Sequence, residues 1–316
     1  MKNIIAAFFS FVLILTFIPL VIFLINEPVP ERKAPDLRPI AVVDPIDEPE
    51  PIMIPVMRHG TNTLEHILLE DYVKGVVASE MPASFELEAL KAQAVAARTF
   101  GLRTLLTEPH IYDTVMDQVF RDESQLREKW GNDFERHFAH VAQAVKETEG
   151  LVMAYRGELI NAMFFAMSNG RTENSEDAFV SKRPYLRSVE SLWDLQAPRF
   201  EVEQEFTLAE IRQLFGNPSL DFGSMTILSR TAGGNVNEIQ VGETVLRGVE
   251  FRRMLGLRSA DFSLSQRDNN IVITTRGNGH GVGMSQYGAN GMAKQGKTFD
   301  YILHFYYQGI EIIEKY

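Results

Sequence analysis

One glutamate in this chain stands where its chemistry can be anticipated from its neighbours. Apolar residues recur at three- and four-residue steps from Leu64 to Val77, which predicts one apolar face of a helix. Glu80 continues that face, and Pro82 should end the helix directly after it. Burial and the negative end of a helix both disfavour a carboxylate, so the pKa of Glu80 should be raised. A carboxyl group of this kind suits a general acid.

Two cations on the next predicted helix are candidate partners of this acid. The helix should begin with Ser84 as its N-cap and run through an alanine-rich stretch toward Leu106. Lys91 and Arg98 are seven residues apart and therefore almost in line on one edge of it. They can organise the Glu80 carboxylate or substrate oxygens. The alternatives are a purely structural carboxylate that pairs with one of them, or a solvated helix edge with weak ion pairs.

Two polar turns supply the remaining candidates, because loop residues that follow strands commonly line sites. The first turn spans residues 168 to 173, and the second spans residues 280 to 287. The candidate residues in these turns are Ser168, Gly170, Arg171, Thr172, His280, Ser285, Gln286 and Tyr287. His280 has an alternative interpretation as a buried ring satisfied by the backbone. The glycines of the second turn fit neither a phosphate loop nor a dinucleotide fingerprint.

The amino-terminal end should place these residues outside the cytoplasm. The run from Ile4 to Ile25 has no charge and is long enough to span a bilayer, so residues 1–27 are expected to form an uncleaved anchor. A cleaved signal peptide is the alternative. Lys2 before the run favours a cytoplasmic amino terminus. Residues 28–57 hold eight of the fourteen prolines and should form an extended linker.

The remaining residues, 58–316, are numerous enough for a large soluble domain with a core. Helical and strand-like segments are mixed along it, which predicts an α+β fold with antiparallel strands in two lobes. The core should comprise residues 58–198 and 267–316, and a smaller inserted lobe should cover about 199–266. Expected elements include a helix over 126–148, a hairpin turning at Arg156 and Gly157, and a strand over 270–275 that returns to the core.

Composition excludes several classes of function. The net charge of −11 argues against nucleic acid as a partner. The chain has no cysteine, which suits an oxidising compartment and excludes a cysteine-type zinc site. We expect no cofactor and no metal, although a histidine-only site that includes His110 stays open.

Five blocks of sequence give the chain a family resemblance. They are residues 69–82 (LEDYVKGVVASEMP), 90–99 (LKAQAVAART), 169–177 (NGRTENSED), 184–189 (PYLRSV) and 279–289 (GHGVGMSQYGA). In these blocks the chain resembles the stage II sporulation protein D family over nearly all of its soluble part. The anchor and linker suit that family too.

The resemblance implies a lytic transglycosylase that cleaves peptide-stripped peptidoglycan glycan strands while the mother cell engulfs the forespore. The family's catalytic glutamate corresponds to Glu80. Independently of the resemblance, the position of Ser285, Gln286 and Tyr287 in a turn lets them hydrogen-bond sugar hydroxyls. The implied location is the mother-cell engulfing membrane, with the catalytic domain facing the septal wall. The implied partners are stage II sporulation protein P, an amidase and endopeptidase, and stage II sporulation protein M, a membrane anchor of the complex.

A hydrolytic glycosidase normally needs two carboxylates, and only Glu80 stands out in this sequence. A transglycosylase can work with one, because the sugar's own C6 hydroxyl replaces water as nucleophile. The other interpretation is a non-catalytic glycan-binding protein that enhances a partner cell-wall amidase, as some relatives of the family do. A structural bridge between two membranes is compatible with either activity.

Overall fold

The computed structural model describes residues 51–179 and 181–316. The predicted anchor at 1–27 and most of the predicted linker lie outside these residues. Within the described part, no helix combines the length and apolar character that crossing a bilayer requires.

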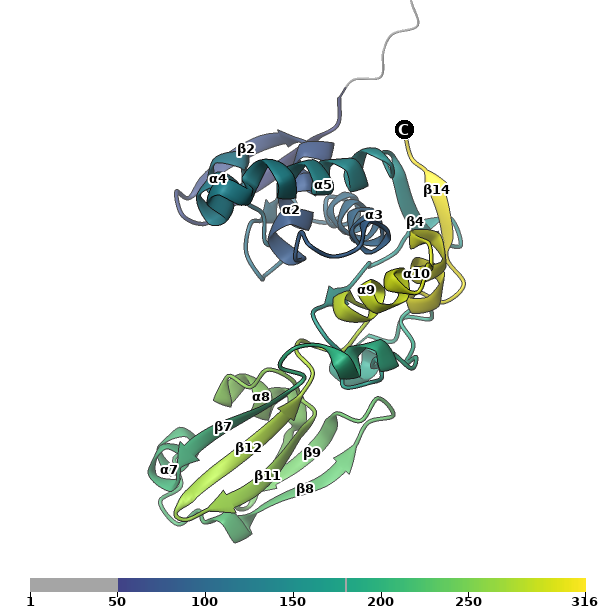
Figure 1. The fold of residues 1–316 in the computed structure, drawn as a ribbon. Coiled ribbons are helices and arrows are strands. Elements are labelled where there is room, and N and C mark those ends of the chain that lie inside the picture. The colour runs from purple at the N-terminus through teal and green to yellow at the C-terminus, as the bar shows by residue number, and fades with distance from the viewer. Residues whose placement is uncertain (1–50, 180) are drawn as a thin grey trace, which may run out of the picture. The chain divides into compact units, whose positions relative to one another are not determined.

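Helices and mostly antiparallel strands alternate along the chain, as the α+β prediction expected (Figure 1). The helices are α2 (Leu69–Glu80), α3 (Leu87–Thr104), α4 (Glu123–Trp130), α5 (Phe134–Lys146), α6 (Ser175–Ala178), α7 (Leu208–Phe215), α8 (Gly248–Leu255), α9 (Gln286–Lys294) and α10 (Phe299–Tyr306). Short 3-10 helices are η1 (Gly131–Asp133), η2 (Leu192–Gln196) and η3 (Phe222–Ser224). The strands are β1 (Met53–Arg58), β2 (Thr63–Leu68), β3 (Ile111–Tyr112), β4 (Leu151–Tyr155), β5 (Glu158–Leu159), β6 (Phe164–Phe165), β7 (Glu201–Thr207), β8 (Met225–Arg230), β9 (Val236–Val241), β10 (Thr244–Arg247), β11 (Phe262–Arg267), β12 (Asn270–Arg276), β13 (Met284–Ser285) and β14 (Glu311–Glu314).

The folded domain begins before the predicted end of the linker at residue 57. Residues 53–58 form β1, in which Ile54 and Val56 are fully buried in the core. Extended backbone was expected here from the prolines, but every second side chain of this apolar segment is buried, and the segment pairs with neighbouring strands. The linker prediction is therefore wrong for residues 53–57.

The predicted first helix is also shortened at its start. Residues 63–68 form β2, which runs antiparallel to β1, with Ile54 opposite Ile67. The spacing of Leu64, Ile67 and Leu68 resembles a helical period, but pairing with β1 decides the local structure. The helix α2 begins only at Leu69.

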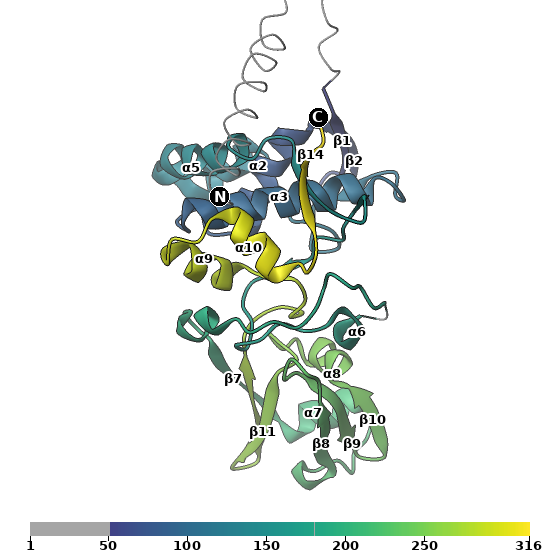
Figure 2. The same ribbon diagram turned by 90° about the vertical axis from the view of Figure 1, so that its right-hand side faces the viewer.

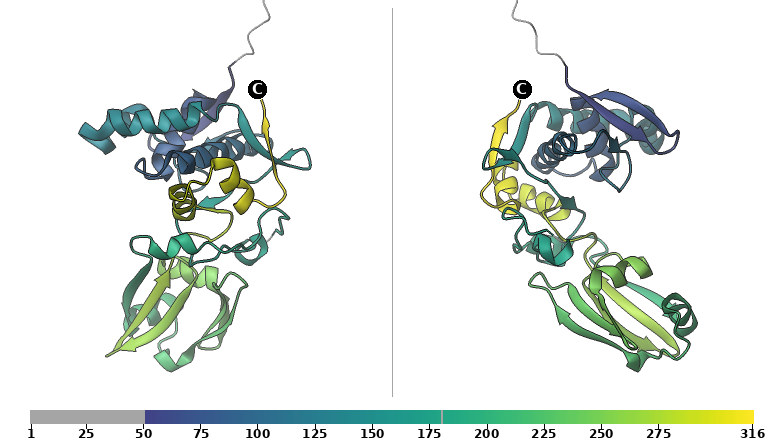
Figure 3. Two further views of the ribbon diagram at one scale, coloured as in Figure 1. Left: turned by 45° about the vertical axis from the view of Figure 1, so that its right-hand side comes forward. Right: turned by 180° about the vertical axis from the view of Figure 1, so that it is seen from behind.

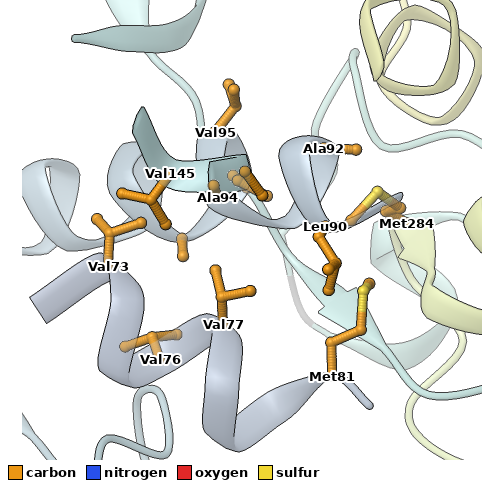
Figure 4. Packing of buried hydrophobic residues seen from close by; sticks show 14 of the residues in the cluster. Val73, Val76, Val77, Met81, Leu90, Ala92, Ala94, Val95, Val145 and Met284 are labelled. Atoms are coloured by element: carbon orange, nitrogen blue, oxygen red, sulfur yellow. The ribbon is translucent and has the colours of Figure 1, made fainter. Parts of the chain in front are cut away.

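Packing between α2 and α3 builds the centre of the larger core. Figure 4 shows Val73 and Val77 of α2 directed toward α3, where the small side chain of Ala94 permits close approach. The predicted N-cap at Ser84 is wrong, because α3 starts at Leu87. The Glu86 backbone N–H finds its acceptor in the side-chain oxygen of Asn290 at 2.9 Å.

In the middle of the chain, one predicted helix is divided in two and one predicted hairpin is found. The helix expected over 126–148 is divided into α4 and α5, because Gly131 has a positive φ of 53°. The β4–β5 hairpin turns at Arg156 and Gly157, as predicted. Figure 3 shows the C-terminal strand β14 (yellow) beside the teal β4, with which it pairs antiparallel.

The inserted lobe has its own hydrophobic core and is longer than predicted. It contains the sheets β10-β9-β8 and β11-β12-β7 around buried Ile239, Phe251 and Ile273 (Figures 1 and 2). Residues 270–275 form a strand as expected, but β12 pairs with β7 and β11 and therefore belongs to the lobe. The lobe spans 201–276 rather than 199–266.

Two helices near the carboxyl terminus complete the larger core. The polar turn predicted over residues 280–287 ends in α9, which already begins at Gln286. Both α9 and α10 pack against α3 (Figure 2). They thereby bring residues 286–306 to the helix pair whose first member carries Glu80.

Candidate functional site

Glu80 occupies the end of α2, as the sequence predicted. The helix stops there, and Met81 continues in extended conformation ahead of Pro82. The half-buried Glu80 side chain accepts a hydrogen bond on Oε1 from the backbone N–H of Val119 at 2.6 Å. This bond fixes one carboxyl oxygen and leaves Oε2 without a hydrogen bond to the described residues.

Opposing influences set the pKa of the Glu80 carboxyl. Burial raises this pKa and is the largest effect. The Val119 N–H and the charges of Arg121 and Lys129 act in the opposite direction but do not cancel it. The net pKa is raised, which favours the protonated form that a general acid needs.

A hollow of about 420 Å³ surrounds this carboxyl. Its lining includes Lys129, Trp130 and His137, and the last two rings lie 5.3 Å apart. Among the described residues that line it, Glu80 is the sole carboxylate. The hollow thus offers one acid, one cation and an aromatic surface.

A larger hollow of about 960 Å³ adjoins the first, since Pro82 and Ser84 line both. Aromatic side chains dominate its walls: Phe85 packs edge-on against Tyr287, and Trp193 packs edge-on against Phe305. Together the two hollows form an extended surface in which sugar rings can lie against aromatic faces.

The two predicted cations do not bond Glu80. Arg98 is fully buried and binds both carboxylate oxygens of Glu70, at 2.7 and 2.6 Å. Glu70 lies in the first turn of α2, about 15 Å along the helix from Glu80 at 1.5 Å per residue. Lys91 pairs with Glu88 and Glu147, at 2.8 and 2.5 Å. Neither residue therefore organises Glu80, and the alternative of a solvated helix edge with weak ion pairs is wrong for the fully buried Arg98.

Ser168 and Ser285 are buried and bind a carboxylate of the protein. Asp194 accepts hydrogen bonds from Ser168 at 2.7 Å, from Ser191 at 2.6 Å and from Ser285 at 2.6 Å. Ser285 also caps α9 through the N–H of Gly288. These hydroxyls connect η2 to α9 and do not face either hollow.

The Gly170, Arg171 and Thr172 turn packs on the segment before η2. The N–H of Ser191 donates to the Gly170 carbonyl at 2.8 Å, and the Thr172 side chain is fully buried. Arg171 forms an ion pair at 3.1 Å with Glu190, which lines the larger hollow. This turn supports the wall of the hollow.

His280 matches the part of the alternative interpretation in which the backbone satisfies the ring, which is partly buried. Its Nδ1 accepts from the Val282 N–H at 3.1 Å, so the proton belongs on Nε2, which donates to the Phe164 carbonyl at 3.0 Å. Burial lowers the pKa of His280 to about 4. Gln286 is buried and donates to Gln93, whereas Tyr287 does line the larger hollow.

Sequence reasoning missed the groups that surround Glu80. Val119, Arg121 and Lys129 are separated from it by 39 to 49 positions, and no periodic pattern connects them to it. The one available signal was the adjacent Lys129 and Trp130, a cation beside an aromatic residue on a predicted helix. Trp193 lies in η2, which no sequence pattern indicated.

Among residues 51–179 and 181–316, no group of three or more histidine, aspartate or glutamate side chains is placed to hold a metal ion. The His110 ring packs edge-on against Tyr112 at 4.9 Å.

The described part of the molecule is thus a mixed α+β protein in which the half-buried acid Glu80 lies at one end of a groove lined by aromatic residues. Residues 57–155 match the family model described as Stage II sporulation protein, SpoIID. The chain is 45% identical over 274 residues to Stage II sporulation protein D of Bacillus subtilis (strain 168), covering 84% of this chain and 80% of the relative. It is 41% identical over 299 residues to the protein of the same name from Bacillus amyloliquefaciens, covering 92% and 87%.

The chain therefore belongs to the stage II sporulation protein D family, which confirms the resemblance and supports a role in sporulation. A more distant relative is the Amidase enhancer of Bacillus subtilis (strain 168), 29% identical over 293 residues. That match covers 75% of this chain but 39% of the enhancer.

Proposed function

We propose that this chain is a lytic transglycosylase that cleaves peptide-stripped peptidoglycan glycan strands and leaves 1,6-anhydro-muramic acid ends. The observation that carries the proposal is the solitary Glu80 carboxyl, which has a raised pKa and opens into a groove. A hydrolase of the usual kind would need a second carboxylate at a defined separation. The described lining of the Glu80 hollow holds no second one.

A single carboxyl can carry out both proton transfers. Protonated Glu80 donates its proton to the glycosidic oxygen as the bond from C1 to that oxygen breaks. The C6 hydroxyl of the same muramic acid then attacks C1, and its proton passes to the Glu80 carboxylate. The ring closes, the acid is regenerated, and no water is consumed.

The groove supports a polymeric substrate. The Glu80 hollow and the larger hollow share Pro82 and Ser84, so a strand that is cut at Glu80 would continue past Phe85 and Tyr287. Sugar rings stack on aromatic faces, which the larger hollow supplies in Trp193 and Tyr287.

The setting of this activity is part of the same proposal. Residues 4–25 would anchor the chain in the mother-cell engulfing membrane, and residues 28–52 would hold the domain at the septal wall. Cleavage would then accompany engulfment of the forespore. Stage II sporulation protein P would supply peptide-free strands, and stage II sporulation protein M would hold the complex at the membrane.

The test is to incubate the purified protein with peptide-free glycan strands and to identify the new ends by mass spectrometry. Glu80→Gln should lower the cleavage rate by a factor of about 10² to 10⁴, the usual contribution of a general acid. Glu158→Gln, at an exposed position in β5, is the matched control and should cleave normally. Reducing ends without anhydro-muramic acid would refute the mechanism, and undiminished cleavage by Glu80→Gln would refute the site.

The similarity to the Amidase enhancer favours one alternative, in which the chain binds glycan and activates a partner amidase. In that case the groove would bind glycan strands without cutting them. Amidase activity would rise equally with the wild-type chain and with Glu80→Gln.

A further inference from the structure

Two cations beside Glu80 have no acidic partner among the described residues. Lys129 and Arg121 are near enough for their charges to act on the Glu80 carboxyl, yet neither forms an ion pair within residues 51–179 and 181–316. By contrast, Arg98 and Lys91 of α3 are paired, with Glu70 and Glu147 respectively. With eleven more acidic than basic residues, the chain does not lack partners. This part of the site has an unpaired positive charge.

Lys129 presents that charge to the hollow. It lies in the last turn of α4 and lines the hollow together with Glu80. One of its N–H groups donates to the Ala78 carbonyl near the end of α2 at 3.1 Å. An ammonium has three donors, so two more remain for a ligand.

The surroundings of Lys129 favour an anion as that ligand. Burial and the charge of Arg121 lower the pKa of the Lys129 ammonium, against the attraction of Glu80. An anion bound at Lys129 would offset this repulsion.

Peptide-stripped muramic acid carries such an anion. Its lactyl ether ends in a free carboxylate once the stem peptide is removed, whereas an attached peptide converts this group to a neutral amide. A lysine that pairs with the carboxylate would therefore distinguish stripped from unstripped strands.

We propose that Lys129 binds the lactyl carboxylate of a peptide-free muramic acid beside Glu80 and so determines the preference for stripped glycan. This inference rests on the proposed function. The contact with Ala78 also allows a different role, in which Lys129 only caps α2. If Lys129 binds the carboxylate, the effect of replacing it should depend on the charge of the substrate. If Lys129 only caps α2, the effect should be the same for charged and uncharged substrates.

The experiment compares two substrates with the full-length protein. One is peptide-free glycan, and the other is the same glycan with its lactyl carboxylates chemically reduced to alcohols. The variants are Lys129→Met, Lys129→Arg and the control Lys146→Met, an exposed lysine of α5 without an ion pair among the described residues. Each variant is assayed about one pH unit below the pH at which its own cleavage rate begins to fall. Glu80 is then protonated in every variant, so differences in its pKa do not affect the comparison.

The wild-type chain should cleave the carboxylate glycan at least about tenfold more efficiently than the reduced glycan, as one substrate ion pair of ordinary strength allows. Lys129→Met should lose this preference through a higher KM, with the reduced glycan cleaved as before. Lys129→Arg and Lys146→Met should keep the preference. An equal loss on both substrates in Lys129→Met, or a wild-type chain without preference, would overturn the inference.

A binding measurement separates this inference from the proposed function. In the Glu80→Gln background, the dissociation constants of both glycans are measured with and without Lys129→Met. If the wild-type chain cleaves neither glycan, the transglycosylase proposal fails. A binding preference that disappears with Lys129→Met would still support carboxylate recognition, and equal binding of both glycans would refute it.

Discussion

The raised pKa of Glu80 predicts how the cleavage rate depends on pH, and the nearby cations should change that dependence. The acid must be protonated to act, so the cleavage rate should fall as pH rises through its raised pKa. Arg121 lowers that pKa through its charge. Removing the charge should therefore raise the pKa further.

We expect Arg121→Met to shift the alkaline limb of the pH–rate profile to higher pH. The direction follows because the neutral acid is favoured once a nearby positive charge is gone. Lys146→Met is remote from Glu80 and should leave the limb in place. The measurement is kcat/KM on peptide-free glycan across the pH range, and a shift to lower pH would show that Arg121 does not act by its charge on Glu80.

The sequence predicted Glu80 itself but little of its surroundings. The local signals for Glu80 were an apolar period, a helix end and a proline, all within a few residues. The positions of Val119, Arg121 and Lys129 depend on how α4 and the segment before it pack against α2, which no local pattern encodes. Ser168 and Ser285 failed as substrate ligands for the same reason, since only the fold shows that Asp194 binds both.

Arg98 acts between elements rather than at the site. Its guanidinium binds Glu70 of α2 through two donors and the Leu151 carbonyl of β4 at 3.0 Å. It thereby ties α2, α3 and β4 together from a fully buried position. The planar guanidinium makes these hydrogen bonds through several donors at fixed positions, and the ammonium group of a lysine cannot reproduce that geometry.

We expect Arg98→Lys to lower the free energy of unfolding by about 1 to 3 kcal/mol, because buried charge-assisted bonds are lost. Cleavage per folded molecule should be unchanged, since Glu70 lies at the opposite end of α2 from Glu80. Arg136→Lys, at an exposed ion pair with Asp133, should change stability by less than about 1 kcal/mol. Denaturant unfolding and a folded-fraction assay measure both effects, and a large rise in KM without loss of stability would assign Arg98 to the site.

Elements with their own local signals were predicted well. The Arg156–Gly157 turn is encoded within a few residues and was found where it was predicted. β2 and the end of the lobe were predicted wrongly, because their structure depends on distant partners. β12 joins the lobe through β7, which is more than sixty residues earlier in the sequence.

At the scale of the whole molecule, the lobe and the core meet at a buried acid. Glu173 Oε1 accepts from the Thr231 hydroxyl at 2.8 Å and from the Asn235 N–H at 3.1 Å, both on the lobe. Its backbone N–H donates to the Gly281 carbonyl of the core. Within the described residues, Glu173 Oε2 is buried without a hydrogen-bond partner.

Burial raises the pKa of Glu173 to about 7, with Asp177 and Asp261 adding to the effect against the two hydrogen bonds. Its ordinary value is 4.5, so the folded protein holds a proton here that the unfolded chain has already lost between those two values. Stability should therefore be greatest below about pH 4.5 and should decline until pH has passed about 7. A shift of this size corresponds to roughly 3 kcal/mol.

Replacing Glu173 with glutamine should abolish this part of the pH dependence, because an amide keeps the acceptor for Thr231 and Asn235 and cannot ionise. Relative to Glu173→Gln, the wild-type chain should lose up to about 3 kcal/mol of unfolding free energy between pH 5 and pH 8. Urea unfolding of both proteins at several pH values measures the difference, in which the other titrating groups cancel. A constant difference across this range would mean that Glu173 is ionised throughout, and that its negative charge is tolerated where the lobe joins the core.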